Sequence, residues 1–312
     1  MTSKPWQKRQ TQYSRAAFPA GVYPGATSDA WLRKSLVLWL VILVAVPCHN
    51  SPIRFVVLEF MVLISLSSNL LGQDELTAVP NRPTVSTPAQ PVQPGVLETE
   101  WGLNAAASHQ DINGLLKFGF SQNFEVRFTN NPITADSGTH GVGDTAAGFK
   151  YRFTRDSAHR PSVSFMYMVK APTAGDVLGS GEIDHAFTFL LSKDLGKHHF
   201  DFNTVVNLLG RPQGGFDHSV LNALAWSHPL SGKWGTTAEL SGTTSPNVVT
   251  PASAQFLAAA TYAVRPRLVL DFGMAARITG DIPDATFIAG FTYSIADLYH
   301  RHSRVQAKPE RR

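Results

Sequence analysis

The sequence predicts an all-β fold: an antiparallel transmembrane up-and-down β-barrel of about 12 strands, preceded by a signal-like segment and a Pro-rich linker. Apolar and polar residues alternate in about twelve stretches between residues 96 and 295. Most stretches run for roughly 9 to 12 residues, the length of a tilted strand that crosses a bilayer, whereas soluble strands average about 5 to 6. The connections alternate between short turns and longer polar loops, as they do in outer-membrane barrels.

The chain divides into four segments. We expect residues 1–72 to be disordered and signal-like, residues 73–95 to be a Pro-rich linker, residues 96–299 to be the barrel, and residues 300–312 to be a basic disordered tail. The first segment has two apolar runs, residues 36–46 and 55–66, each behind basic residues. Both are shorter than the roughly 18 to 20 residues of a spanning helix, so a signal peptide is favoured over a retained membrane anchor.

The linker prediction rests on proline density. Pro80, Pro83, Pro88, Pro91 and Pro94 lie among Thr, Ser and Gln residues. Proline at this density prevents both a helix and a central strand, which leaves an extended chain. We interpret the segment as a spacer, with a proline-rich motif for a partner protein as the alternative.

Each predicted strand has one apolar face and one polar face. The hairpin at residues 182–209 shows this most clearly, because Glu182 and Asp184 alternate with Ile183 and His185 and the pattern continues beyond the turn. The stretch at residues 218–227 is the weakest, since two sets of apolar residues compete there. In order, the twelve predicted strands include Trp101, Phe118, Val126, Phe149, Phe165, Phe187, Phe202, Ala223, Ala238, Ala260, Phe272 and Phe291.

Alternation by itself also fits a soluble sandwich, so strand length, loops and aromatic positions decide between the two folds. Short turns are predicted at residues 122–123, 192–197, 228–233 and 265–266, and longer loops at residues 131–142, 171–181, 210–217 and 244–251. A short link at residues 109–113 and a longer one at 154–160 are exceptions. Aromatic residues are expected near strand ends, where interfacial girdles lie, at Trp101, Phe153, Trp226, Trp234 and Tyr262.

The charge distribution argues against nucleic-acid binding. The formal net charge is +4, but residues 73–299 contain 15 Lys and Arg against 20 Asp and Glu, so the basic excess lies in the two terminal segments. Cys48 is the single cysteine and precedes the predicted barrel. A disulfide within the chain and a cysteine-based metal site are therefore excluded.

The polar face of the strands supplies candidate residues that line the lumen. They are Lys117, Glu125, Arg127, Lys150, Arg152, Lys170, Glu182, Asp184, Asp201, Glu239, Arg267 and Asp271. The basic residues concentrate on the second to fifth strands and the acidic ones on the sixth to ninth, which predicts opposed charged walls. The alternative is that these groups pair with one another and fill the lumen. About twelve strands fit either a narrow pore or a closed scaffold, since barrels near 8 strands are filled and those near 16 to 18 are open.

Searches for catalytic and metal motifs give none that we assign. The glycine-rich residues 141–148 lack the Lys-Ser/Thr that ends a phosphate-binding loop. Adjacent histidines on a strand face opposite ways, so His198 and His199 are interpreted as surface residues. An outward His185 has apolar neighbours rather than a serine and a carboxylate. We predict no catalytic residue, no metal site and no cofactor, and hence a protein that is not an enzyme.

Several short motifs form a recognisable set, namely Gly143-Asp144-Thr145 and the segments at residues 148–153, 169–173, 191–196, 227–230, 268–273 and 281–284. This set resembles the motifs of a bacterial outer-membrane barrel family, the transporters of the MetA pathway of phenol degradation. The likeness spans nearly all of the predicted barrel. It implies an outer-membrane channel or transporter, and it provides no motif for a substrate-binding site.

Together these observations favour an outer-membrane channel for small solutes, aromatic or apolar ones among them. The alternative is a structural or adhesive barrel with a closed lumen. The expected partners are outer-membrane lipid, a small-molecule solute and the barrel-assembly machinery, which reads a terminal aromatic residue such as Tyr299. The sequence makes no prediction of the oligomeric state.

Overall fold

The computed structural model describes residues 76–175 and 178–299, and the regular elements of these residues are all β-strands. The predictions for residues 1–75 and 300–312 lie outside the described residues. No helix within the described ranges is long and apolar enough to cross a membrane. The strands are β1 (Val96–Ala105), β2 (His109–Gly119), β3 (Phe124–Asp136), β4 (Thr139–Gly141), β5 (Thr145–Thr154), β6 (Ser162–Ala171), β7 (Asp184–Leu195), β8 (His198–Gly210), β9 (Phe216–Pro229), β10 (Trp234–Thr243), β11 (Ser253–Arg265), β12 (Leu268–Thr279) and β13 (Ala285–Asp297).

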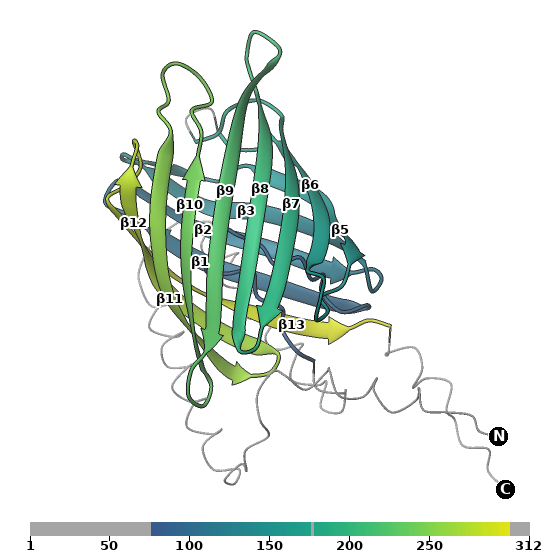
Figure 1. Ribbon diagram of the computed structural model, residues 1–312. Helices are drawn as coiled ribbons and strands as arrows, with labels where there is room; N and C mark the ends of the chain where they lie inside the picture. Colours follow the sequence, from purple (N-terminus) through teal and green to yellow (C-terminus); the bar gives the residue numbers. More distant parts are fainter. Residues whose placement is uncertain (1–75, 176–177, 300–312) are drawn as a thin grey trace, which may run out of the picture. The chain divides into compact units, whose positions relative to one another are not determined.

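The sheet closes into a barrel (Figure 1). Apart from β4, each strand pairs antiparallel with the next strand in sequence, so that β2 pairs with β3 and β3 with β5, and β1 pairs with β13 to complete the ring. The short β4 pairs with the end of β3 and extends one connection beyond the barrel wall. The predicted antiparallel up-and-down barrel is therefore confirmed, with 12 strands in the wall and β4 as an addition.

Apolar side chains cover the outside of the barrel and polar ones its inside. Phe153 and Phe287 on the outer face are 61% and 64% exposed, whereas Glu98 and Lys117 on the inner face are fully buried. A soluble protein shows the reverse distribution, because water favours charged groups outside. A closed barrel with an apolar outer belt matches a bilayer, and barrels of this kind lie in bacterial outer membranes.

The two ends of the barrel differ in their connections, and the structure corrects some of the predicted boundaries. One end has short turns, such as those between β7 and β8 and between β11 and β12, while the other has the longer loops (Figure 1). The predicted short link at residues 109–113 is wrong, because these residues belong to β2 and the link is residues 106–108. Similarly, the predicted loop at residues 131–142 contains the end of β3 and all of β4.

Aromatic side chains gather at the short-turn end of the outer face. The Trp234 and Tyr262 rings lie 4.8 Å apart, and Trp226 stacks on His198 and His228 near the ends of β8 and β9. Trp101 was expected in this girdle but lies in the middle of β1, opposite Gly114 of β2. A methyl group at Gly114 would lie 2.8 Å from the Trp101 ring, so the small residue makes space for the indole.

Closure of the sheet predicts heat-modifiable migration on a gel. A barrel whose backbone groups are paired and that has no free edge should resist detergent until it is heated. We expect the unboiled protein to run faster in SDS gel electrophoresis than the boiled protein. Equal migration of the two samples, or recovery of the chain as an ordinary soluble periplasmic protein, would contradict this fold in membranes.

Candidate functional site

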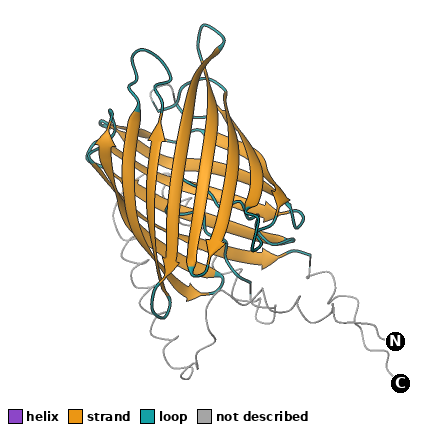
Figure 2. Ribbon diagram, viewed as in Figure 1, coloured by secondary structure: helices purple, strands orange, loops and turns teal. Residues whose placement is uncertain are grey.

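The lumen contains a segment of the chain itself, residues 76–95, which we call the inner collar. It forms hydrogen bonds or ion pairs with ten of the twelve barrel strands, on opposite sides of the barrel, and is visible as a loop inside it (Figure 2). Along the collar the partner strand changes in order from β1 through β10, β8, β7 and β6 to β3. The expected spacer is therefore wrong for these residues, which are held against the inner wall.

Four carboxylates of the wall, Glu98, Glu100, Glu125 and Glu239, accept hydrogen bonds from the collar backbone. Glu98 accepts from the N–H of Val79 at 2.9 Å. Glu100 accepts from two consecutive N–H groups, those of Asn81 at 3.0 Å and Arg82 at 3.1 Å. On the far wall, Glu239 accepts in the same manner from Val85 at 2.8 Å and Ser86 at 2.7 Å. Because each paired contact uses both oxygens of one carboxylate, it fixes the direction of the chain as well as its position.

Neutral polar side chains hold the next part of the collar. The side-chain amide of Asn203 accepts from the Thr87 N–H at 2.7 Å and donates to the Thr87 carbonyl at 3.0 Å. Ser192 accepts from the Ala89 N–H at 2.7 Å, and Ser164 donates to the carbonyl of the same residue at 2.5 Å. Both polar groups of Thr87 and of Ala89 are thus satisfied by side chains of the wall, as buried backbone groups require.

Buried lysines bind the carbonyl groups of the collar. Lys150 donates to Pro88 at 3.0 Å and to Gln90 at 3.2 Å, while Lys117 donates to Val79 at 2.7 Å. The wall therefore offers carboxylates to the N–H groups and ammonium groups to the carbonyls. Charge-assisted bonds of this kind are stronger than bonds between neutral groups.

One collar side chain is recognised as well as the backbone. Arg82 donates to Asn113 Oδ1 at 2.8 Å, and its Nε lies 3.4 Å from Asp271 Oδ1. Glycine on β1 creates the space, since a methyl group at Gly102 would lie 1.8 Å from the Arg82 guanidinium carbon. At the end of the collar, a methyl group at Gly119 would lie 2.0 Å from the carbonyl oxygen of Gln93. Both glycines permit the close approach of the collar to the wall.

The expected opposed charged walls are wrong, because the basic residues pair with acids on their own side of the barrel. Lys117 lies 2.7 Å from Glu98 and also forms an ion pair with Glu100. Arg127 and Lys150 lie 3.3 and 3.8 Å from Glu125. The two acids of β1 were absent from the candidate list, although the sequence placed them on the polar face of the first strand.

The twelve candidate residues fall into three groups. Seven are buried on the inner wall, Lys170 and Asp184 pair at 2.6 Å at the long-loop rim, and three do not line the lumen. The seven are Lys117, Glu125, Arg127, Lys150, Asp201, Glu239 and Asp271.

The prediction is wrong for three of the candidate residues, which do not line the lumen. Arg152 donates to the Gln122 carbonyl and reaches Asn123 in the turn between β2 and β3, so it caps that turn. Glu182 precedes β7 and lies in a loop. Arg267 donates to the hydroxyl of Tyr293, and its guanidinium carbon lies 4.9 Å from the ring centre. Tyr293 has the outward parity of Phe287, so Arg267 has turned away from the lumen.

At the long-loop rim, Asp144 ties two loops together. It accepts from the N–H groups of Thr173 at 3.0 Å and Ala174 at 2.9 Å, and it lies 2.9 Å from Lys170 Nζ. Burial alone would raise the pKa of Asp144, but the Ala174 N–H and the Lys170 ammonium outweigh that effect and lower it. A carboxylate with a lowered pKa stabilises the fold above its unfolded pKa of about 3.9 and loses this contribution as the pH falls through the lower, folded value.

We expect Asp144→Asn to loosen the connection between β6 and β7, because the amide carries no charge to attract Lys170. Limited proteolysis with proteinase K at neutral pH should then cut this loop faster than in the wild type. The wild-type loop should keep its resistance throughout pH 5 to 8. An unchanged cleavage rate in the variant would show that Asp144 does not hold the loop.

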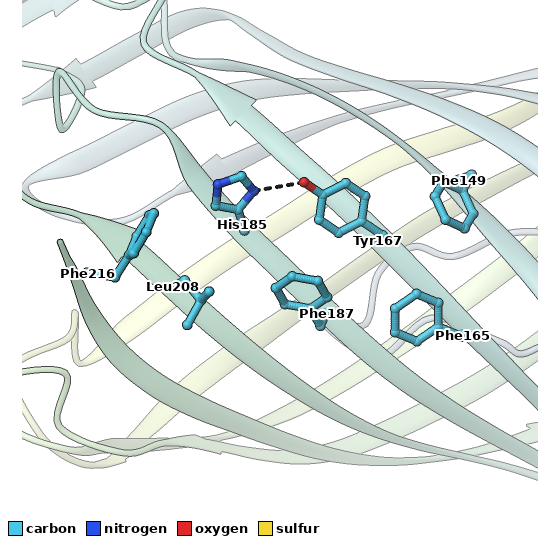
Figure 3. Close-up of a pocket in the computed structure, with 7 residues that line it drawn as sticks. All are labelled: Phe149, Phe165, Tyr167, His185, Phe187, Leu208 and Phe216. Atoms are coloured by element: carbon cyan, nitrogen blue, oxygen red, sulfur yellow. Dashed lines mark hydrogen bonds between the residues drawn. The ribbon is translucent and has the colours of Figure 1, made fainter.

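The outer wall contains an aromatic depression that surrounds His185 (Figure 3). His185 Nδ1 and the Tyr167 hydroxyl lie 2.8 Å apart, and Phe187 and Phe216 pack beside them. The Tyr167 hydroxyl and His185 are thus a polar pair within an aromatic part of the outer surface. Among residues 76–175 and 178–299, no group of three or more His, Cys, Asp or Glu side chains is placed to hold a metal ion.

Comparison with known proteins supports the fold. No family model matches the sequence, and a search of curated proteins finds no match. Among solved structures, an outer-membrane channel from Pseudomonas putida F1 is similar, with a TM-score of 0.53 and 12% identity over 66% of this chain and 97% of that one. The NanC porin has a TM-score of 0.47 and 9% identity over 64% of this chain and 99% of that one.

The chain thus has the fold of an outer-membrane β-barrel. The first comparison covers nearly the whole of the Pseudomonas channel, and at 12% identity it shows the fold alone. The apolar outer face and the polar inner face of the described barrel agree with this class of protein. The resemblance to the MetA-pathway family stays a prediction, since no family model supports it.

Proposed function

We propose that this protein is an outer-membrane channel for small solutes and that the inner collar sets the width of its passage. The observation that carries the proposal is that residues 76–95, rather than side chains of the wall alone, fill the lumen. Barrels of about eight strands fill their interior with their own side chains. Here the wall instead presents polar groups to a separate segment, so that displacement of the collar would leave a hydrated passage rather than an apolar void.

The charge of the inner wall indicates which ions such a passage would prefer. The barrel buries seven acidic side chains, Glu98, Glu100, Glu125, Asp201, Glu239, Asp271 and Asp297, against three basic ones, Lys117, Arg127 and Lys150. Fixed charge in a narrow pore attracts ions of opposite sign. We therefore expect the conducting state to favour cations.

A planar-bilayer recording of the wild type and of the double variant Asn203→Ala/Glu239→Ala tests the proposal. The two substitutions remove the acceptors of the N–H groups at Val85, Ser86 and Thr87. We expect a small wild-type conductance and a severalfold larger, cation-selective conductance in the variant. Glu182→Gln is the matched control, because Glu182 lies in a loop outside the barrel wall.

The alternative function is a structural or adhesive barrel with a closed lumen, and the same recording distinguishes it. If neither the wild type nor the double variant conducts, and neither lets solutes into liposomes in a swelling assay, the channel is contradicted. The heat-modifiable gel shift of both proteins would show that they are folded, so a silent recording could not be attributed to misfolding.

A further inference from the structure

We infer that the inner wall is a binding track for an extended, proline-containing peptide, which residues 76–95 occupy in the resting barrel. The inference deepens the proposed function and rests on it, because it names the class of molecule that the lumen accepts. Two observations support it: the wall contacts many backbone groups of the collar, and the collar prolines lie between the N–H groups that the wall binds.

The side chains of the wall bind mainly the backbone groups of the collar. Side chains of the wall accept from eight N–H groups, those of Val79, Asn81, Arg82, Val85, Ser86, Thr87, Ala89 and Val92. Wall side chains also donate to five carbonyl groups, those of Val79, Thr87, Pro88, Ala89 and Gln90. Recognition of backbone groups is independent of most side chains, so peptides of different sequence satisfy the same track.

The prolines lie only at positions where the wall does not use an N–H group. Pro80, Pro83, Pro88 and Pro91 alternate with the donors, and none of them could donate. The extended conformation that proline favours also carries the donors across the lumen, from Glu100 on β1 to Glu239 on β10 and Asn203 on β8. Each of these prolines therefore lies between two donor positions, where the wall has no acceptor that it would leave without a partner.

One side chain adds selectivity to the backbone contacts. The Arg82 guanidinium contacts Asp271 and Asn113 and lies over Gly102. The preferred ligand is thus an extended peptide with prolines at the unused positions and one basic residue near its start. The acidic excess of the inner wall favours such a cationic peptide over an acidic one.

The test uses the full chain with a protease site inserted between Gln93 and Pro94, where Gln93 is exposed. The protein is folded, cut, and mixed with a fluorescent peptide of residues 76–93, and binding is followed by anisotropy. We expect saturable exchange of the peptide into the barrel. A second peptide keeps the prolines and Arg82 but scrambles the other residues, and it should bind within a few-fold of the first.

The matched control peptide exchanges each of four prolines with the residue that follows it. Composition and length stay the same, but prolines then occupy positions 81, 84, 89 and 92. Three of these are donor positions whose acceptors are Glu100, Ser192 and Glu125. We expect this peptide to bind at least tenfold more weakly, and equal binding of the two would overturn recognition through the backbone.

The remaining outcomes separate this inference from the proposed function. If the cut segment leaves and conductance rises but no peptide rebinds, the peptide track is overturned and the channel stands. If the cut segment stays bound, the variant Arg82→Ala is used to weaken its binding to the wall. If neither peptide then enters the barrel of this variant, the peptide track is overturned. Rebinding of the peptide without any conductance, before or after cutting, supports the track and contradicts the channel.

Discussion

Replacing Lys117 with methionine should lower the free energy of unfolding by about 3–5 kcal/mol, because it leaves buried carboxylates without their counter-charge. The Lys117 side chain is fully buried, and its ammonium group contacts Glu98, Glu100 and the Val79 carbonyl. Methionine has a similar volume, so loss of packing contributes little. Urea unfolding of the protein in lipid vesicles, followed by tryptophan fluorescence, measures the effect.

Two controls separate charge from packing. The double variant Lys117→Met/Glu100→Gln should recover part of the loss, since one of the two unpaired carboxylates is then neutral. Lys170→Met, at the rim, should cost less than about 1 kcal/mol, because its ion pair with Asp184 is partly exposed to solvent. If the costs of Lys117→Met and Glu100→Gln simply add, the two residues are not coupled.

The wall of the barrel could be predicted because its physical cause is local. A strand with lipid on one side and a polar lumen on the other must alternate, and each alternating stretch in the sequence became a strand of the wall. Trp101 shows the limit of this reasoning. Its outward direction follows from parity, whereas its place in the middle of β1 depends on where the strand begins and ends.

The pairing of charges could not be predicted because it depends on register. Lys117 is opposite Glu98 across the pair of β1 and β2. The predicted link at residues 109–113 would have made the second strand begin late, and it left the register between these strands undefined. As a result, no sequence pattern linked the basic residue of one strand to the acids of its neighbour.

The collar was missed because proline density predicts only what the backbone cannot do. Prolines exclude a helix and a central strand, but the N–H groups between them still require acceptors when they are buried. Three of those acceptors, Ser192, Asn203 and Glu239, lie 103 to 154 residues away in sequence. The available signal was weak: Gly102 lies within β1 and Gly119 is the last residue of β2, at the points where the collar approaches the wall.

Arginine on the lipid face should destabilise the barrel strongly, and Phe189 is the most informative position. Phe189 lies near the middle of β7, is 57% exposed on the outer face and pairs with Thr204 of β8. We expect Phe189→Arg to cost about 2–4 kcal/mol, because a charge near the midplane of a bilayer is poorly solvated. Phe187→Arg, nearer the long-loop end, should cost less. Urea unfolding in lipid vesicles measures both.

The inward control is Asn207→Arg, on the opposite face at nearly the depth of Phe187. Phe187 pairs with Val206, the residue next to Asn207, and the Asn207 side chain contacts Ser219 on the inner wall. An arginine there meets a polar surface with an acidic excess, so we expect a cost below about 1 kcal/mol. A larger cost for Phe189→Arg and Phe187→Arg than for Asn207→Arg would establish which face meets lipid. Equal losses for Phe187→Arg and Asn207→Arg would mean that the assignment of the two faces is wrong.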